Sequence, residues 1–250
     1  MPPQLPTVFL FLLAASVLRA DRLLDQVRSA QATLGTDVWS RVIRVENETQ
    51  PSRYPRTLHA LVFEFGGILW FYTPVDGTQS FSLHRDRLEE EKSDFGPLLK
   101  DIDPGFVRWT VVAGTGRSRP RRGGELPNGC FIDSVAALHD RRKRGEVVGE
   151  PRLLSYYVAT PDGMSGHTVL ALISPDRVEV IDAAESARPR SFARPMGGDA
   201  AGLAMVLAGE TVVKARWIPA AEPPEVREGA FAGGGAGDSP MPGPRELAVR

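Results

Sequence analysis

The stretch Asn128-Gly129-Cys130-Phe131-Ile132-Asp133-Ser134-Val135-Ala136-Ala137-Leu138 contains the only cysteine of this 250-residue chain. Its apolar residues Phe131, Val135 and Leu138 recur at helical spacing and predict an amphipathic helix. We expect Asn128 to cap this helix and Gly145, which follows four consecutive cations, to end it. The N–H groups at a helix start favour a thiolate and can bind an oxyanion, so Cys130 is a candidate nucleophile.

The composition sets broad limits on fold and function. The chain is 42% hydrophobic and 24% charged, which is typical of a globular protein. Its formal net charge of -1 gives no general attraction for nucleic acid, and we expect no nucleic-acid partner. One cysteine excludes an intrachain disulfide and a cysteine-cluster metal site. The four histidines lack metal-ligand spacing, so we assign no metal and no cofactor.

The two ends of the chain differ from the middle. Residues 8–18 form an apolar run that is short for a membrane span and has the length of a signal-peptide core. Cleavage is expected after Ala20, which would leave a secreted or periplasmic protein with no membrane span. An uncleaved anchor and a buried N-terminal helix are the alternatives. From residue 219, Pro, Gly, Ala and charge dominate and predict a disordered tail.

The remaining segments alternate between strand and helix patterns without a regular βαβ order, which favours an α+β fold. Strands are expected at 38–46, 58–65, 68–73, 78–84, 106–113, 153–160, 167–173, 177–182 and 211–218. Helices are expected at 21–34, 85–93 and 200–208, besides the cysteine helix. The predicted regions are a signal peptide (1–20), a helix plus β-rich region (21–115), a core with the cysteine (116–218) and the tail (219–250).

Two of these strands place a histidine near an aspartate. If residues 173–176 form the hairpin loop, Leu172 pairs with Arg177, and His167 lies opposite Asp182 on the face of Val169. Their Cβ atoms would then be about 5 Å apart, close enough for a hydrogen bond between the side chains. Cysteine, histidine and aspartate suit nucleophilic catalysis. The thiolate attacks a carbonyl carbon, the imidazole transfers protons, and the carboxylate orients the imidazole.

The segments Asn128-Gly129-Cys130, Gly166-His167-Thr168-Val169 and Val180-Ile181-Asp182-Ala183 resemble the papain-like and transglutaminase-like superfamily of thiol enzymes over residues 125–183. The resemblance implies a core in which the cysteine helix packs on an antiparallel sheet, with the N-terminal β-rich region outside it. It implies a Cys130, His167 and Asp182 triad, with Asn128 and Gly129 supporting the oxyanion or the helix start. The function so implied is an exported thiol-dependent amide hydrolase or acyltransferase, related to cysteine peptidases, with a peptide or protein substrate.

Structural interpretations of the same residues remain open. A lone cysteine is often a small buried hydrophobe. His167 could be an ordinary hydrogen-bonded strand residue, and Asp182 a strand-end carboxylate. Under these interpretations the chain is a non-catalytic secreted or envelope protein that uses residues 38–113 for binding. We expect the aromatic residues at 70–72 to belong to a hairpin core, and the basic runs 117–122 and 141–144 to be solvated.

Overall fold

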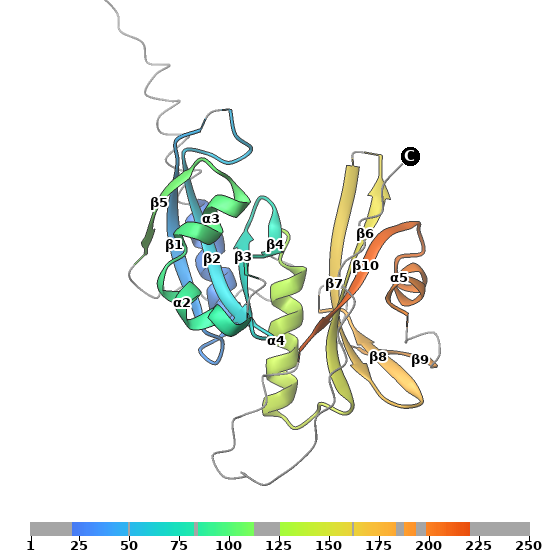
Figure 1. Cartoon of the computed structure of the whole chain (residues 1–250). Coiled ribbons are helices and arrows are strands. Elements are labelled where there is room, and N and C mark those ends of the chain that lie inside the picture. The colour runs from blue at the N-terminus through green and yellow to red at the C-terminus, as the bar shows by residue number, and fades with distance from the viewer. Residues whose placement is uncertain are drawn as a thin grey trace, which may run out of the picture.

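The computed structural model describes residues 22–49, 51–82, 85–112, 126–161, 163–183, 188–193 and 199–220. The apolar run 8–18, the basic run 117–122 and the tail beyond residue 220 lie outside the described residues. Within these ranges the fold is α+β, with two five-stranded antiparallel sheets and α4 (Cys130–Lys143) between them (Figure 1). In the same ranges no helix is both long and apolar enough to cross a membrane.

Sheet A contains the first half of the chain, in the strand order β4-β3-β2-β1-β5. Its strands are β1 (Ser40–Asn47), β2 (Thr57–Phe65), β3 (Ile68–Thr73), β4 (Gly77–Ser80) and β5 (Phe106–Val111). A helix over residues 22–34 precedes it, as expected. Between β4 and β5 lie η1 (Arg85–Arg87), α2 (Leu88–Ser93) and α3 (Gly96–Ile102).

Sheet B contains the second half, in the order β10-β6-β7-β8-β9. Its strands are β6 (Glu150–Thr160), β7 (Gly163–Ile173), β8 (Arg177–Ile181), β9 (Arg190–Ala193) and β10 (Val212–Pro219). Helix α5 (Ala200–Ala208) packs on the face of sheet B that is turned away from α4. Asp199 caps α5 through hydrogen bonds to the N–H groups of Ala201 and Gly202, and Gly209 ends it in the left-handed conformation, as predicted.

The β2–β3 hairpin has the tight turn that the sequence predicts. Phe65 pairs with Ile68, which leaves a two-residue turn of Gly66 and Gly67. Both glycines have positive φ, 64° and 71°, as a type I′ turn requires. Glycine adopts this conformation without the penalty that a Cβ imposes, so the Gly-Gly pair sets the register of the hairpin.

Helix α4 joins the two sheets into one core. The Phe131 ring packs against sheet A, with its centroid 4.4 Å from that of Trp70 and 6.1 Å from that of Phe63. Leu153 and Leu170 of sheet B belong to the same buried cluster. Burial of Phe131, which is 4% exposed, contributes about 2–3 kcal/mol. Since α4 is held from both sides, its first residue has a fixed place relative to both sheets.

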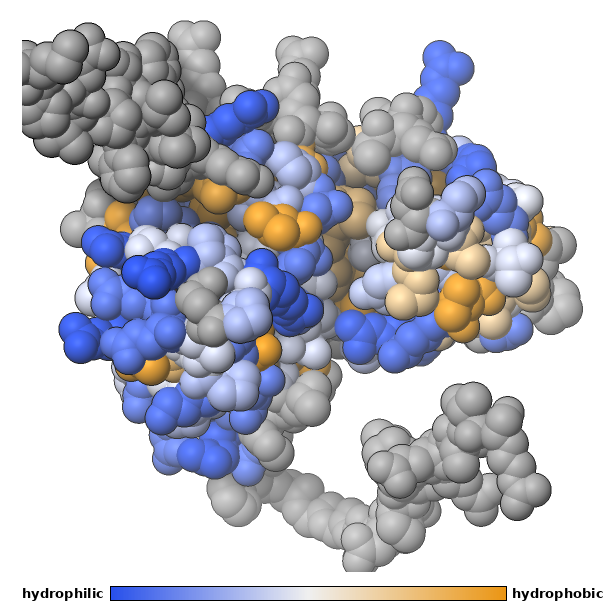
Figure 2. All heavy atoms as spheres, turned by 90° about the horizontal axis from the view of Figure 1, so that it is seen from above, coloured by the Kyte–Doolittle hydropathy of each residue, from blue (hydrophilic) through white to orange (hydrophobic). Residues whose placement is uncertain are grey.

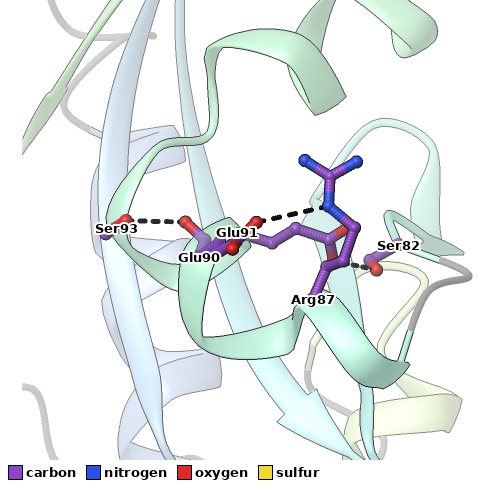
Figure 3. Close-up of polar contacts among 5 residues, drawn as sticks. All are labelled: Ser82, Arg87, Glu90, Glu91 and Ser93. Atoms are coloured by element: carbon purple, nitrogen blue, oxygen red, sulfur yellow. Dashed lines mark hydrogen bonds and ion pairs between the residues drawn. The ribbon is translucent and has the colours of Figure 1, made fainter.

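The outer face of sheet A is covered by α2 and α3. Two residues after β4, the Ser82 hydroxyl donates a hydrogen bond to the carboxylate of Glu91 on α2 (Figure 3). Arg87 pairs with Glu90 at 3.3 Å, and Ser93 bonds the Glu90 carbonyl, within the same turn. The expected helix over 85–93 is therefore present and mostly exposed, except that Glu91 faces inward and is 7% exposed.

Candidate functional site

Cys130 is the first residue of α4 and is partly exposed. One turn later, the fully buried hydroxyl of Ser134 lies 2.8 Å from the Cys130 carbonyl and 3.0 Å from the Thr168 carbonyl. Thr168 follows His167 on β7. The single hydroxyl proton of Ser134 is thus shared between the helix turn that carries Cys130 and the strand that carries His167. This contact fixes the cysteine and the histidine relative to each other.

His167 and Asp182 are hydrogen-bonded, with 2.7 Å between His167 Nε2 and Asp182 Oδ2. Their side chains are 28% and 8% exposed, so the pair is largely shielded from water. Asp182 directly follows β8. The aromatic ring of Tyr156, paired with His167 across β6 and β7, meets the imidazole edge-on at 5.6 Å. The predicted neighbourhood of imidazole and carboxylate is therefore present.

The register that brings them together differs from the expected one. Leu172 pairs with Glu179, not with Arg177, and Ile173 pairs with Val178. The loop is therefore Ser174–Arg177, closed by the Ser174 N–H on the Arg177 carbonyl, and the predicted register is wrong by two residues. A shift of two preserves the face of each residue. Asp182 remains on the His167 side of the sheet but reaches it diagonally, beyond the last β7–β8 pair.

The same imidazole also interacts with the cysteine. Its hydrogen bond with Asp182, followed by its hydrogen bond with Cys130, raises the pKa of His167 to about 10. Because Nε2 is engaged with Asp182, Nδ1 is the ring nitrogen left for the thiol. Cys130, His167 and Asp182 are thus brought together in the expected order.

Asn128 does not act as the helix cap, and that prediction is wrong. Gly129 is the N-cap, and it has no side chain to cap with. Asn128 has φ of +53°, a conformation that asparagine tolerates, and its side-chain amide donates to the carbonyls of Pro74 and Val75 at 3.1 and 3.0 Å. Both amide protons are used, so the side chain has no donor left for an oxyanion.

The segment that leads into α4 is therefore bound to sheet A. Tyr72 strengthens this attachment, because its hydroxyl donates to the Pro127 carbonyl at 2.8 Å. Burial of this tyrosine raises its pKa. Gly129 packs so tightly that a Cβ there would lie 2.4 Å from the Cβ of Leu126. Together, these contacts fix the position of Cys130.

Cys130 and His167 line a cleft of about 330 Å³, and Asp182 contacts this cleft only through the His167 ring. Its walls come from both sheets, with Trp70 and Asp76 from sheet A and Tyr157 and Arg216 from sheet B. Seen from above, the surface is hollowed between the sheet A part and the sheet B part (Figure 2). Cys130 is therefore partly exposed at the cleft wall.

Sequence reasoning did not identify three residues of this site. Ser134 was detectable, because it lies four residues after Cys130 on the same helix face. Arg216 and Tyr157 gave no signal, since they enter the cleft through strand register alone. Trp70 is a core residue as expected, and it also lines the cleft.

The cations at the end of α4 contact neighbouring groups of the protein. Arg141 lies 3.7 Å from Glu179, Arg144 pairs with Glu146 at 2.8 Å, and Arg142 donates to the Ala220 carbonyl at 2.7 Å. These contacts account for the basic run 141–144 without an external anion.

Within the described ranges, no group of three or more His, Cys, Asp and Glu side chains is placed to hold a metal ion. Comparisons with protein-family models, curated proteins and solved structures find no match to this chain.

Proposed function

We propose that the protein is a thiol-dependent amide hydrolase or acyltransferase of the cysteine peptidase type, acting on peptide or protein substrates. One observation carries the proposal. The His167 ring is hydrogen-bonded to the Asp182 carboxylate at 2.7 Å, its pKa is raised by Asp182 and then by Cys130, and His167 and Cys130 line the same open cleft. A papain-like or transglutaminase-like core and export from the cell are part of the same proposal.

The first half of the reaction forms a thioester. With the proton already held by the His167 ring, the Cys130 sulfur attacks the carbonyl carbon of the amide, whose oxygen becomes an oxyanion. His167 then gives its proton to the amide nitrogen, the C–N bond breaks, and an amine leaves. Asp182 accepts a hydrogen bond from Nε2–H throughout, which holds the ring in place and stabilises its protonated form.

The oxyanion needs hydrogen-bond donors, and the start of α4 supplies them. The first N–H groups of a helix have no acceptor within the helix. The N–H groups of Cys130 and Phe131 open α4 and are suitably placed by sequence to stabilise the negative oxygen. Asn128 is not one of these donors, since its amide is bound to Pro74 and Val75.

The second half releases the acyl group. His167 takes a proton from water or from a second amine as it attacks the thioester carbon, and the Cys130 sulfur leaves. Attack by water gives hydrolysis, and attack by an amine gives transfer.

The proposal is tested by the rate at which iodoacetamide alkylates Cys130 between pH 5 and 9, followed by mass spectrometry. We expect fast labelling below pH 7 that His167→Ala slows by about 10-fold or more, because the protonated ring stabilises the thiolate. His139→Ala removes another histidine, on α4, and should leave the rate unchanged.

A rate in the wild type that matches an unassisted thiol, or one that His167→Ala does not alter, would refute the proposal. That result would favour the alternative of a non-catalytic secreted binding protein with the same fold.

A further inference from the structure

Strand β10 brings two cations to the face of sheet B that borders the cleft. Arg216 pairs with Ser155, which pairs with Thr168, so these three residues form a row across β10, β6 and β7. Lys214 lies two residues earlier and pairs with Tyr157, which puts it on the same face as Arg216. The Arg216 row leads from β10 directly to the residue after His167.

Arg216 is oriented by an aromatic ring. Its guanidinium carbon lies 6.0 Å from the centroid of Trp70, across the cleft on sheet A, and both residues line the cleft with Cys130. Contact with the ring shields one face of the guanidinium from water. Its N–H groups, which are directed along the edges of the planar group, remain available to bind a carboxylate in a bidentate manner.

Arg152 on β6 is compensated, because it pairs with Glu150 at 2.8 Å, and Glu179 on β8 pairs with Arg141 of α4. Among the ion pairs and hydrogen bonds of the described residues, neither Arg216 nor Lys214 has a carboxylate partner. Both side chains are exposed. The side of the cleft formed by β10 therefore carries uncompensated positive charge.

The wall of the cleft that faces Arg216, on sheet A, carries a negatively charged side chain. Asp76, in the turn between β3 and β4, is the acidic residue among those that line the cleft in the described part of the chain. Its carboxylate lies close enough to the Tyr54 hydroxyl to contribute to the raised pKa of that tyrosine. An extended substrate would thus meet a cation at sheet B and an anion at sheet A.

We propose that the Arg216 side of the cleft binds a carboxylate of the substrate, so that preferred substrates carry an acidic residue next to the reacting amide. This assignment rests on the proposed function, because it places the carboxylate relative to Cys130. Arg216 is a specificity residue here, and Lys214 adds to the attraction at longer range.

The test uses two alkylating probes of nearly equal size, iodoacetyl-glutamate amide and iodoacetyl-glutamine amide. On the wild-type protein the glutamate probe should label Cys130 roughly fivefold faster, an effect near the upper end for ion pairs at protein surfaces. Arg216→Gln should bring the ratio of the two rates close to one, and added salt should lower it in the wild type. Arg190→Gln, which removes an exposed cation from β9, should leave the ratio unchanged.

The outcomes separate the two proposals. Fast labelling by both probes at equal rates, or a ratio that Arg216→Gln does not change, overturns the carboxylate site and leaves the proposed function intact. Labelling by both probes at the rate of an unassisted thiol overturns the proposed function, and the carboxylate site with it.

Discussion

Replacement of Asp182 by asparagine should change how the stability of the protein depends on pH. The carboxylate accepts a hydrogen bond from the His167 ring at 2.7 Å and is the main reason that the pKa of His167 rises from 6.5 to about 10. A group whose pKa is higher in the folded state stabilises that state fully below its unfolded pKa. This contribution is then lost as the pH rises toward the folded value. The window for this pair is therefore pH 6.5 to about 10.

The size of the effect follows from the shift and from the burial of the pair. One pKa unit corresponds to about 1.4 kcal/mol, and solvent screening reduces the contribution of a partly exposed group. With the imidazole side chain 28% exposed, we expect the wild type to lose about 2–3 kcal/mol more than Asp182→Asn between pH 6.5 and 10.

The assay is urea unfolding, followed by fluorescence at pH 6, 7, 8, 9 and 10. Asp176→Asn is the matched control, because it removes an exposed carboxylate from the loop of the same β7–β8 hairpin. Its profile should follow that of the wild type. Parallel profiles for wild type and Asp182→Asn across the whole window would show that the ion pair contributes no folding energy, and would refute the reasoning.

Three further substitutions test the parts that hold Cys130. Ser134→Ala removes the hydroxyl between helix and strand and should lower the free energy of unfolding by about 1–2 kcal/mol. It should also slow alkylation of Cys130, and Ser134→Thr should restore part of that rate. Asn128→Ala loses two hydrogen bonds and should destabilise by about 1–2 kcal/mol, whereas Asn128→Gly should destabilise less because glycine readily adopts positive φ. Phe131→Ala leaves a cavity between α4 and sheet A and should destabilise by about 3–5 kcal/mol in thermal unfolding. Unchanged stability in any of the three would contradict the contact concerned.

The elements with strong local signals were predictable from the sequence. The Gly66–Gly67 hairpin and the α5 helix that ends at Gly209 are both present, because their turn and cap residues leave few alternatives. Helix α3 was missed, since Gly96 and Pro97 suggest a turn although proline is well accommodated in the first turn of a helix. The four-residue edge strand β9 was also missed, because it is too short to show a periodic pattern.

The candidate site was predictable in its residues and less so in its geometry. The sequence placed His167 and Asp182 on the same face of the β7–β8 hairpin. This part of the prediction is correct although the register is wrong by two residues, because a shift of two leaves each residue on its face. The role of Asn128 was mispredicted, because asparagine is favoured both at helix N-caps and in turns with positive φ. Here Asn128 occupies the turn, and Gly129 is the N-cap. Arg216 comes from a strand distant in sequence, and only the sheet order brings it to the cleft.

The most direct test of the central claim is the protonation of the His167 ring, measured by the ¹⁵N chemical shifts of both ring nitrogens from pH 5 to 11. If the ring is shared between Asp182 and Cys130, both nitrogens should remain protonated well above pH 8, with a pKa of about 10. Cys130→Ala should lower that pKa, because it removes the second of the two hydrogen bonds that raise it. A ring that titrates near 6.5 in the wild type, or one whose titration is the same in Cys130→Ala, would contradict the account.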